Sequence, residues 1–387
     1  MKQRLSARHF CTQAKVEVEA IPTVCSPPNT SQPAEGEWWV CPGLIDVQVN
    51  GYAGIDFQTG TLSLADLKYA SAGLRRDGCA GFFPTLITAE WPQMLSQLRQ
   101  LKRLREQDAV LKKHILGWHL EGPFLSEQPG FCGAHNPAWM RNPSAPDIDA
   151  LKEIVDTDPV LITLAPERPG AIQWIHDATR AGFSVSLGHT NASASELREA
   201  IDAGARGFTH MGNAIPQELP RHNHVLWRML DTPLACASLI PDGIHLPPEV
   251  IRTLWRAFGP DRFYFTTDAM AAAGAGPGRY HIGSLEVEVG AEQIVRQPGK
   301  SHFAGSALRP IDGVFRAASL LGISWTSAWE CASVRPLQLL FPQRYSTLAQ
   351  RCDAHLVCVN RAGDRLDHGP VTLAEPLSFN RISHGHE

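Results

Sequence analysis

The chain has 387 residues, which is enough for one large barrel or for two or three domains of average size. Apolar residues make up 43% of it and charged residues 19%, a composition typical of a globular protein with a substantial core. A formal net charge of −4 is too balanced for a protein that binds nucleic acid or a membrane surface. No unbroken apolar run approaches the roughly 18 residues of a membrane helix, so we expect a soluble protein.

The nine cysteines are scattered, odd in number and never spaced as Cys-x-x-Cys. This pattern disfavours a disulfide framework or a zinc ribbon and favours a reducing compartment. The basic start of the chain is not followed by the apolar segment of a secretion signal. We therefore expect a cytoplasmic protein.

Eight short apolar segments, rich in β-branched and aromatic residues, begin near Leu44, Gly81, Ile115, Val160, Phe183, Gly207, Cys236 and Arg262. Between most of them lie stretches with helical periodicity, for example residues 64–76, 91–105, 171–181, 194–203 and 248–258. Buried strands that alternate with helices predict a parallel sheet, and eight such units predict an α/β fold of the (β/α)₈ TIM-like barrel type. A doubly wound open sheet is the alternative, but no G-x-G-x-x-G turn follows the first strand.

The two ends of the chain have a different pattern. Residues 1–40 contain an alternating stretch and a Pro/Ser/Asn-rich loop at 26–36, and short strands are expected again at 353–374. We predict a small β-sandwich-like domain formed from both chain termini, residues 1–41 plus 345–387. The barrel would then span 42–344, with a hairpin inserted after the eighth strand near 280–300.

Polar side chains stand at the carboxyl ends of the predicted strands: Gln48, Asn50, His119, Glu121, Glu167, His189, His210, Asp242, His245 and Asp268. In a barrel these ends meet on the face where active sites are built. A single buried histidine is more often a hydrogen-bonded core residue, but several such residues on one face favour a site. Two histidines plus one carboxylate form a known catalytic zinc shell, which Glu121, His189 and His210 fit.

A metal-assisted hydrolysis also needs a base. Asp268 ends an apolar strand and is placed to take a proton from the attacking water. The alternative is that Asp268 is a hydrogen-bonding partner of a ligand histidine. For Glu167 we expect a hydrogen-bonded structural role rather than a metal ligand.

Nine motifs in these segments resemble those of the N-acetylglucosamine-6-phosphate deacetylases, a family of the amidohydrolase superfamily. They are Pro42-Gly-Leu-Ile-Asp-Val-Gln-Val-Asn-Gly, His119-Leu-Glu-Gly-Pro-Phe, Ala134-His-Asn-Pro, Thr163-Leu-Ala-Pro-Glu, Gly188-His-Thr-Asn-Ala, Thr209-His-Met-Gly-Asn-Ala, Asp242-Gly-Ile-His, Thr267-Asp-Ala-Met-Ala and Ala304-Gly-Ser-Ala-Leu. They run in order from residue 42 to 308, which is nearly the whole predicted barrel. Their combination, not any one of them, carries the resemblance.

The resemblance implies roles for individual residues. Glu121, His189 and His210 match the family's metal ligands, and Asp268 matches its general acid/base. His245 matches a catalytic residue that contacts substrate near the scissile carbonyl and the phosphate. Further matches to substrate-binding positions are His135, Asn213 and Ala214.

The resemblance also bears on the number of metal ions. Gln48 and Asn50 stand where many amidohydrolases have His-x-His, the ligands of a second metal. Amide side chains are poor zinc ligands, and the fourth strand offers no lysine that could bridge two ions. We therefore expect one divalent metal ion per chain, Zn²⁺ by its ligand set.

One stretch departs from the family pattern. After Asn213-Ala the family has an arginine, followed by Glu-Pro-Gly, that reaches a neighbouring subunit's sugar phosphate. Here Arg221 stands in a different context, and Gly212 replaces a bulky residue. If Arg221 keeps this role, the protein is a homodimer. His222 and His224 are either further anion contacts or exposed loop residues.

The predicted function is metal-dependent deacetylation of an N-acetylated amino sugar, with N-acetylglucosamine 6-phosphate as the expected substrate. The closest alternatives are an N-acetylgalactosamine 6-phosphate, an unphosphorylated amino sugar or a cyclic amide, because the same machinery serves all of them. An alternative of another class is a catalytically dead barrel used as a scaffold or sensor. The presence of the metal shell and of Asp268 disfavours that alternative.

Overall fold

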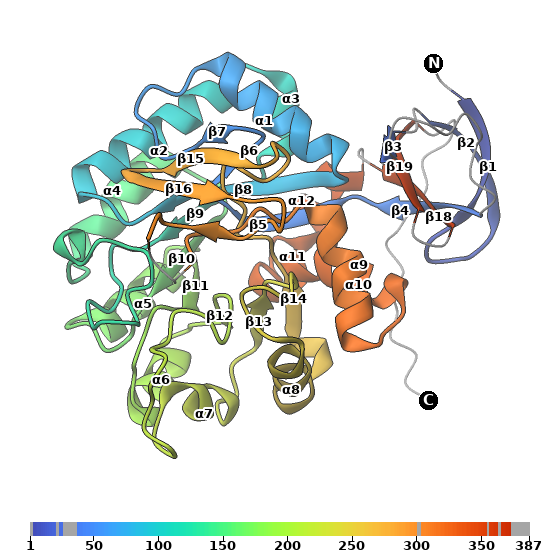
Figure 1. The fold of residues 1–387 in the computed structure, drawn as a ribbon. Helices are drawn as coiled ribbons and strands as arrows, with labels where there is room; N and C mark the ends of the chain where they lie inside the picture. The colour runs from blue at the N-terminus through green and yellow to red at the C-terminus, as the bar shows by residue number, and fades with distance from the viewer. Residues whose placement is uncertain are drawn as a thin grey trace.

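The computed structural model describes residues 3–20, 23–25, 37–299, 303–353, 356–362 and 365–372. Figure 1 shows a barrel surrounded by helices and, to its right, a small sheet in which blue N-terminal strands lie beside red C-terminal strands. The predicted fold class, a (β/α)₈ barrel with a small β unit built from both termini, is confirmed. The loop expected at 26–36 lies outside the described residues.

Eight parallel strands form the barrel and follow one another in chain order. They are β5 (Leu44–Val49), β8 (Cys79–Ile87), β9 (Trp118–Glu121), β10 (Val160–Leu164), β11 (Ser184–Leu187), β12 (Gly207–Phe208), β13 (Cys236–Leu239) and β14 (Phe263–Phe265). Nearly every residue of these strands is buried, because the inner face packs in the barrel and the outer face packs under helices. This burial explains why the strands appear in the sequence as continuous apolar runs.

The first and last strands meet at their carboxyl ends. Val49 pairs with Ala269 in a parallel bridge, and the Asn50 backbone N–H donates to the Ala269 carbonyl at 2.7 Å. The buried Asp46 carboxylate accepts hydrogen bonds from the hydroxyl groups of Thr266 and Thr267. These contacts close the barrel at the end where the polar side chains gather.

Helices cover the outside of the barrel (Figure 1). Those between successive strands are α1 (Leu64–Arg76), α2 (Trp91–Glu106), α3 (Ala109–His114), α4 (Ala145–Val155), α5 (Ala171–Arg180), α6 (Ala194–Asp202), α7 (Val225–Leu230) and α8 (Pro248–Phe258), with the 3₁₀ turns η1 (Pro137–Trp139) and η2 (Pro260–Arg262). Ser63 and Ser193 begin α1 and α6 with capping boxes, in which each serine and the acid three residues later satisfy each other's backbone N–H groups.

Helices α9 (Pro310–Leu321), α10 (Trp325–Ala332), α11 (Arg335–Leu340) and α12 (Tyr345–Asp353) follow the last strand. Leu337 and Leu340 of α11 and Leu348 of α12 pack with buried strand residues such as Ile45 and Phe83 in one apolar cluster. This cluster lies at the amino ends of the strands, so the carboxyl ends form the face that is free to hold a site.

Two small sheets lie over that face. Strands β6 (Gly51–Tyr52) and β7 (Ile55–Asp56) follow β5, and β15 (Gly278–Ile282), β16 (Leu285–Val289) and β17 (Val295–Arg296) follow β14. The second sheet stands where a hairpin was expected, with one more strand than predicted. The Asp56 carboxylate accepts the Gly283 backbone N–H at 2.9 Å and joins the two sheets.

The terminal sheet contains β1 (Gln3–His9), β2 (Lys15–Ala20), β3 (Thr23–Cys25), β4 (Trp38–Pro42), β18 (Leu356–Ala362) and β19 (Arg365–Thr372). Strand β18 pairs with β4, and β19 pairs with β2 and β3, so each end of the chain supplies partners for the other. The predicted boundaries at 41 and 345 remain a prediction. The seven cysteines with described side chains are free, and none of the described helices has the length and apolar character needed to span a bilayer.

Candidate metal centre and active site

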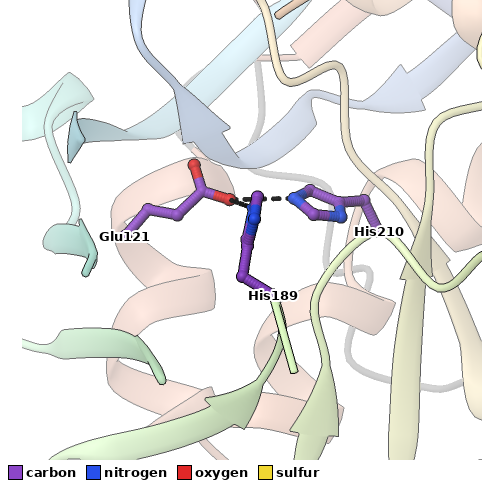
Figure 2. A group of neighbouring side chains, drawn as sticks. All are labelled: Glu121, His189 and His210. Atoms are coloured by element: carbon purple, nitrogen blue, oxygen red, sulfur yellow. Dashed lines mark hydrogen bonds and ion pairs between the residues drawn. The ribbon is translucent and has the colours of Figure 1, made fainter. Parts of the chain in front are cut away.

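Glu121, His189 and His210 converge at the carboxyl ends of β9, β11 and β12 (Figure 2). Glu121 Oε1 lies 2.8 Å from His210 Nε2 and 3.2 Å from His189 Nε2. One ligand atom from each residue lies within 4.8 Å of the others, and all three side chains are buried. Three residues spread over 90 positions of the sequence therefore form one compact group.

The backbone at this group has an uncommon conformation. His189, His210 and Asp268 have positive φ values of 51°, 31° and 53°, although none of them is glycine. Such backbone costs free energy and persists only where the surrounding structure enforces it, which is typical of functional sites. Beside it, a Cβ on Gly133 would lie 3.0 Å from His189 Cε1, so glycine is required for this close approach.

The three side chains fit a divalent metal ion. His189 Nδ1 lies 3.1 Å from the Phe131 carbonyl oxygen, a contact that orients the ring so that Nε2 faces Glu121 and is the nitrogen available to a cation. A buried carboxylate needs a positive partner, and two imidazoles with one carboxylate form the donor set that zinc accepts. Burial raises the pKa of Glu121, but hydrogen bonds from His189 and His210 outweigh it and hold that pKa well below its usual range. Glu121 is therefore charged and available as a ligand.

Asp268 follows β14 and lines the same cavity. Burial and the nearby charge of Glu121 raise its pKa to about 7. Asn50 Nδ2 donates to Asp268 Oδ1 at 2.7 Å, which fixes the orientation of the carboxylate. Asp268 can thus hold or release a proton near neutral pH, as a general acid/base must.

His245 lies in the turn after β13 and also lines the cavity. Its Nδ1 lies 2.6 Å from Asp242 Oδ2, and Asp242 further accepts the backbone N–H groups of Ile244 and His245. This contact places the hydrogen on Nδ1 and directs Nε2 away from Asp242.

The residues expected to bind substrate lie around the same space. His135, Asn213 and Ala214 line the cavity, and the Asn213 amide donates to the His210 carbonyl at 3.1 Å. His135 Nδ1 lies 2.9 Å from the Thr88 hydroxyl, and its Nε2 lies 4.0 Å from Glu121 Oε2. The cavity measures about 450 Å³, and no Lys or Arg is among the described residues that line it.

Other predicted residues lie outside this lining. Arg221 and His222 are exposed, and His224 packs against Trp227 with ring centroids 5.3 Å apart. Gln48 is buried and does not line the cavity. The Glu167 carboxylate accepts the Thr190 hydroxyl and, at 2.7 Å, the Asn191 backbone N–H, contacts that agree with the structural role expected for it.

Sequence reasoning missed one contact at this site. It treated Asn50 only as the replacement of a metal-binding histidine, whereas Asn50 touches the candidate base. The motif could not reveal this contact because the two residues are 218 positions apart and meet only when the barrel closes.

Comparisons with known proteins agree with this geometry. A scan against protein-family models gives no match. The chain is 32% identical over 337 residues to N-acetylglucosamine-6-phosphate deacetylase from Danio rerio, an alignment that covers 83% of this chain and 80% of the relative. It is 31% identical over 301 residues to N-acetylgalactosamine-6-phosphate deacetylase from Escherichia coli O157:H7, covering 78% of each.

A solved structure of a mutant N-acetyl-D-glucosamine-6-phosphate deacetylase from Mycobacterium smegmatis, in complex with N-acetyl-D-glucosamine-6-phosphate, matches with a TM-score of 0.74. It is 29% identical, and the match covers 91% of this chain and 94% of that one. With these similarities extending over most of the barrel and its metal-ligand group, the chain belongs to the N-acetylglucosamine-6-phosphate deacetylase family of the amidohydrolases.

Proposed function

We propose that this protein hydrolyses the acetamido group of N-acetylglucosamine 6-phosphate, giving acetate and the amino sugar 6-phosphate. The observation that carries this proposal is the buried group of Glu121, His189 and His210 with Asp268 in one cavity. The sequence similarity to deacetylases over most of the chain supports it.

Glu121, His189 and His210 would hold one divalent cation, for which we propose Zn²⁺ because of the nitrogen and oxygen donors. When bound, such a cation acts as a Lewis acid toward the amide carbonyl and makes water a better nucleophile near neutral pH. The side chains of Gln48 and Asn50 offer no second site of this kind, so we propose one ion per chain.

Asp268 moves the proton. Its carboxylate takes a proton from the attacking water and delivers it to the amide nitrogen as the carbon–nitrogen bond breaks. Both halves of this transfer need a carboxylate that is charged before attack and protonated after it, which Asp268 can be. Asn50 holds one carboxylate oxygen and leaves the other to carry the proton.

His245 assists at the carbonyl oxygen. Because Asp242 anchors Nδ1, Nε2 is the ring nitrogen left to act as a donor toward the oxygen on which negative charge develops. Removing one such donor typically costs on the order of 3 kcal/mol of transition-state stabilisation.

The phosphate needs a cation that the described lining of the cavity does not contain. Arg221 is exposed on the loop after Asn213-Ala214, so we propose that it reaches the phosphate bound in a second copy of the chain. The active form would then be a homodimer. A guanidinium suits this task, since it grips phosphate through two parallel hydrogen bonds.

The test is an acetate-release assay on N-acetylglucosamine and N-acetylgalactosamine, each with and without the 6-phosphate, together with metal analysis. We expect the highest kcat/KM on N-acetylglucosamine 6-phosphate and about one ion per chain. Preference for the galactosamine epimer would instead favour the activity for which the Escherichia coli relative is named. Two stoichiometric ions, both needed for activity, would contradict the single-metal proposal.

Neither of the remaining alternatives would release acetate in this assay, and activity on a cyclic amide would separate them. A cyclic amidase would release no acetate from any of the four sugars. A scaffold or sensor would also release no acetate, and its function would not depend on Asp268. The activity of a hydrolase would depend on that residue. The assembly of the metal-ligand group beside an oriented carboxylate favours the hydrolase.

A further inference from the structure

A second cavity of about 610 Å³ lies beside the one that holds the metal-ligand group. Its walls come from the loop after β7, the start of α2, the η1 segment and the β15–β16 turn. Six residues line both cavities: Ile87, Gly133, Ala134, His135, Ile282 and Leu285. The two cavities therefore adjoin at these residues.

The walls of the second cavity are held by contacts that do not involve the metal ligands. The Gln58 amide nitrogen donates to the carbonyls of Asn50 and Thr85 at 3.1 and 2.8 Å, and its oxygen accepts the Ile87 N–H at 3.0 Å. The β15–β16 turn is fixed by the bond from Gly283 to Asp56. Hydrogen bonds within the fold therefore hold the walls of this cavity in place.

The chemistry of the second cavity differs from that of the first. No Asp, Glu, Lys or Arg is among the described residues that line it. Its polar groups include the amides Gln93, Gln97, Asn136 and Gln297, and one aromatic ring, Trp139, stands among them. Amides hydrogen-bond neutral hydroxyl groups, and an aromatic ring offers an apolar face. An uncharged polyhydroxyl ligand fits this lining, whereas an anion would find no charged partner.

The residues that line both cavities mark where such a ligand would join the substrate. His135 borders both cavities, and its Nε2 lies 4.0 Å from Glu121 Oε2. Asn213 and Ala214 line only the first cavity. A group attached to the amino sugar would pass His135 to reach the second cavity.

We propose that the second cavity is a subsite for an uncharged sugar ring attached to the amino sugar. The substrate class then includes N-acetylated amino sugar 6-phosphates with a neutral glycosyl group attached to the sugar ring. This inference rests on the proposed function, which places the acetamido group. The reaction is unchanged: water adds its oxygen to the acetyl carbon, the bond from that carbon to the nitrogen breaks, and the nitrogen takes the proton. The glycosidic bond stays intact.

The test compares N-acetylglucosamine 6-phosphate with two synthetic derivatives that carry glucose at the anomeric carbon or at O3. Wild type is expected to release acetate from one derivative with a kcat/KM at least equal to that of the simple sugar. Gly60→Trp and Ser284→Trp add a large side chain from two different loops of the lining, since a Cβ at Gly60 meets no atom within 4 Å and Ser284 is exposed in the hairpin turn. Each should lower kcat/KM on that derivative about tenfold or more and leave the simple sugar unaffected.

Thr61→Trp is the matched control, because it adds the same side chain next to Gly60 at an exposed position outside the lining. It should change neither activity. Slow hydrolysis of both derivatives by wild type, or equal losses on both kinds of substrate in the two filling variants, would overturn the subsite while the proposed function stands. No acetate from any substrate would overturn the proposed function and the subsite with it.

Discussion

At the scale of single residues, the side chains to which we assign catalysis and metal binding are held in place by hydrogen-bonding partners. The Phe131 carbonyl contacts His189 Nδ1, and the Asp242 carboxylate contacts His245 Nδ1. The Asn50 amide donates a hydrogen bond to Asp268. These partners decide which atom of each functional group faces the cavity. When a substitution lowers activity, a second measurement is needed to show whether the reacting group itself or its positioning has been lost.

Replacing Asp268 with asparagine should retain the metal ion and lose most of kcat. The amide keeps the shape of the carboxylate but cannot shuttle a proton, and proton transfer by a positioned group typically contributes roughly 10²- to 10⁴-fold. The measurement is kcat together with metal content on the same preparation. Loss of the ion, with residual activity proportional to the ion that remains, would mean that Asp268 supports the metal instead.

Replacing Arg221 with alanine should impair only the phosphorylated substrate. A charge-assisted hydrogen bond contributes on the order of 1.5–3 kcal/mol, so kcat/KM on the 6-phosphate should fall about 10- to 150-fold. The unphosphorylated sugar, measured in parallel, is the control. Equal losses on both sugars would make Arg221 a structural residue.

At the scale of elements, the sequence predicted all eight barrel strands and the main helices, because buried strands and amphipathic helices have distinct periodicities. The third strand was expected from Ile115 but begins at Trp118, since Ile115 closes helix α3 before pairing with Phe82. An apolar run alone does not separate the end of a buried helix from the start of a strand. Strand β17 was missed because it has only two residues.

The link between β7 and the β15–β16 turn should give the protein a measurable pH dependence. Burial raises the pKa of Asp56 from 3.8 to about 6, against the effect of its backbone hydrogen bonds. A carboxyl with a raised folded-state pKa favours the folded state fully below pH 3.8, and this contribution is lost as pH rises through 6. The lost contribution is at most about 3 kcal/mol, since one pKa unit corresponds to about 1.4 kcal/mol.

Asp56→Asn removes this titration. In denaturant titrations, the free energy of unfolding of the variant should increase relative to that of wild type from pH 4 to pH 7, because only wild type loses stability as Asp56 ionises. The exposed Asp149→Asn serves as the control. A difference between variant and wild type that is constant over this range would show that Asp56 does not titrate there.

At the scale of the whole molecule, the two ends of the chain complete one sheet, and the convergence of the metal ligands was predicted from strand order alone. The contact between Asn50 and Asp268, the exposed position of Arg221 and the second cavity were beyond prediction. Each depends on loops or on barrel closure, where side-chain placement is set by neighbours remote in the sequence.

Deleting residues 1–40 should yield insoluble protein. The deletion removes the partners of β18 and β19, and an unpaired strand edge offers backbone groups to other chains. The measurement is the soluble fraction after expression, with activity on whatever remains. A soluble, active deletion variant would show that the barrel does not need its terminal sheet.

The closure of the barrel between β5 and β14 has a consequence for folding. Asp46 and Thr266 are 220 positions apart, and Asn50 meets Asp268 across the same seam. Contacts between such distant parts of a chain form slowly, because most of the intervening polypeptide must be ordered first. Catalytic competence should therefore be the last property to appear during refolding, after helix content and compactness have recovered. In an enzyme of this design Asp268, the proposed proton-transfer group, stays misplaced until the first and last strands of the barrel have met.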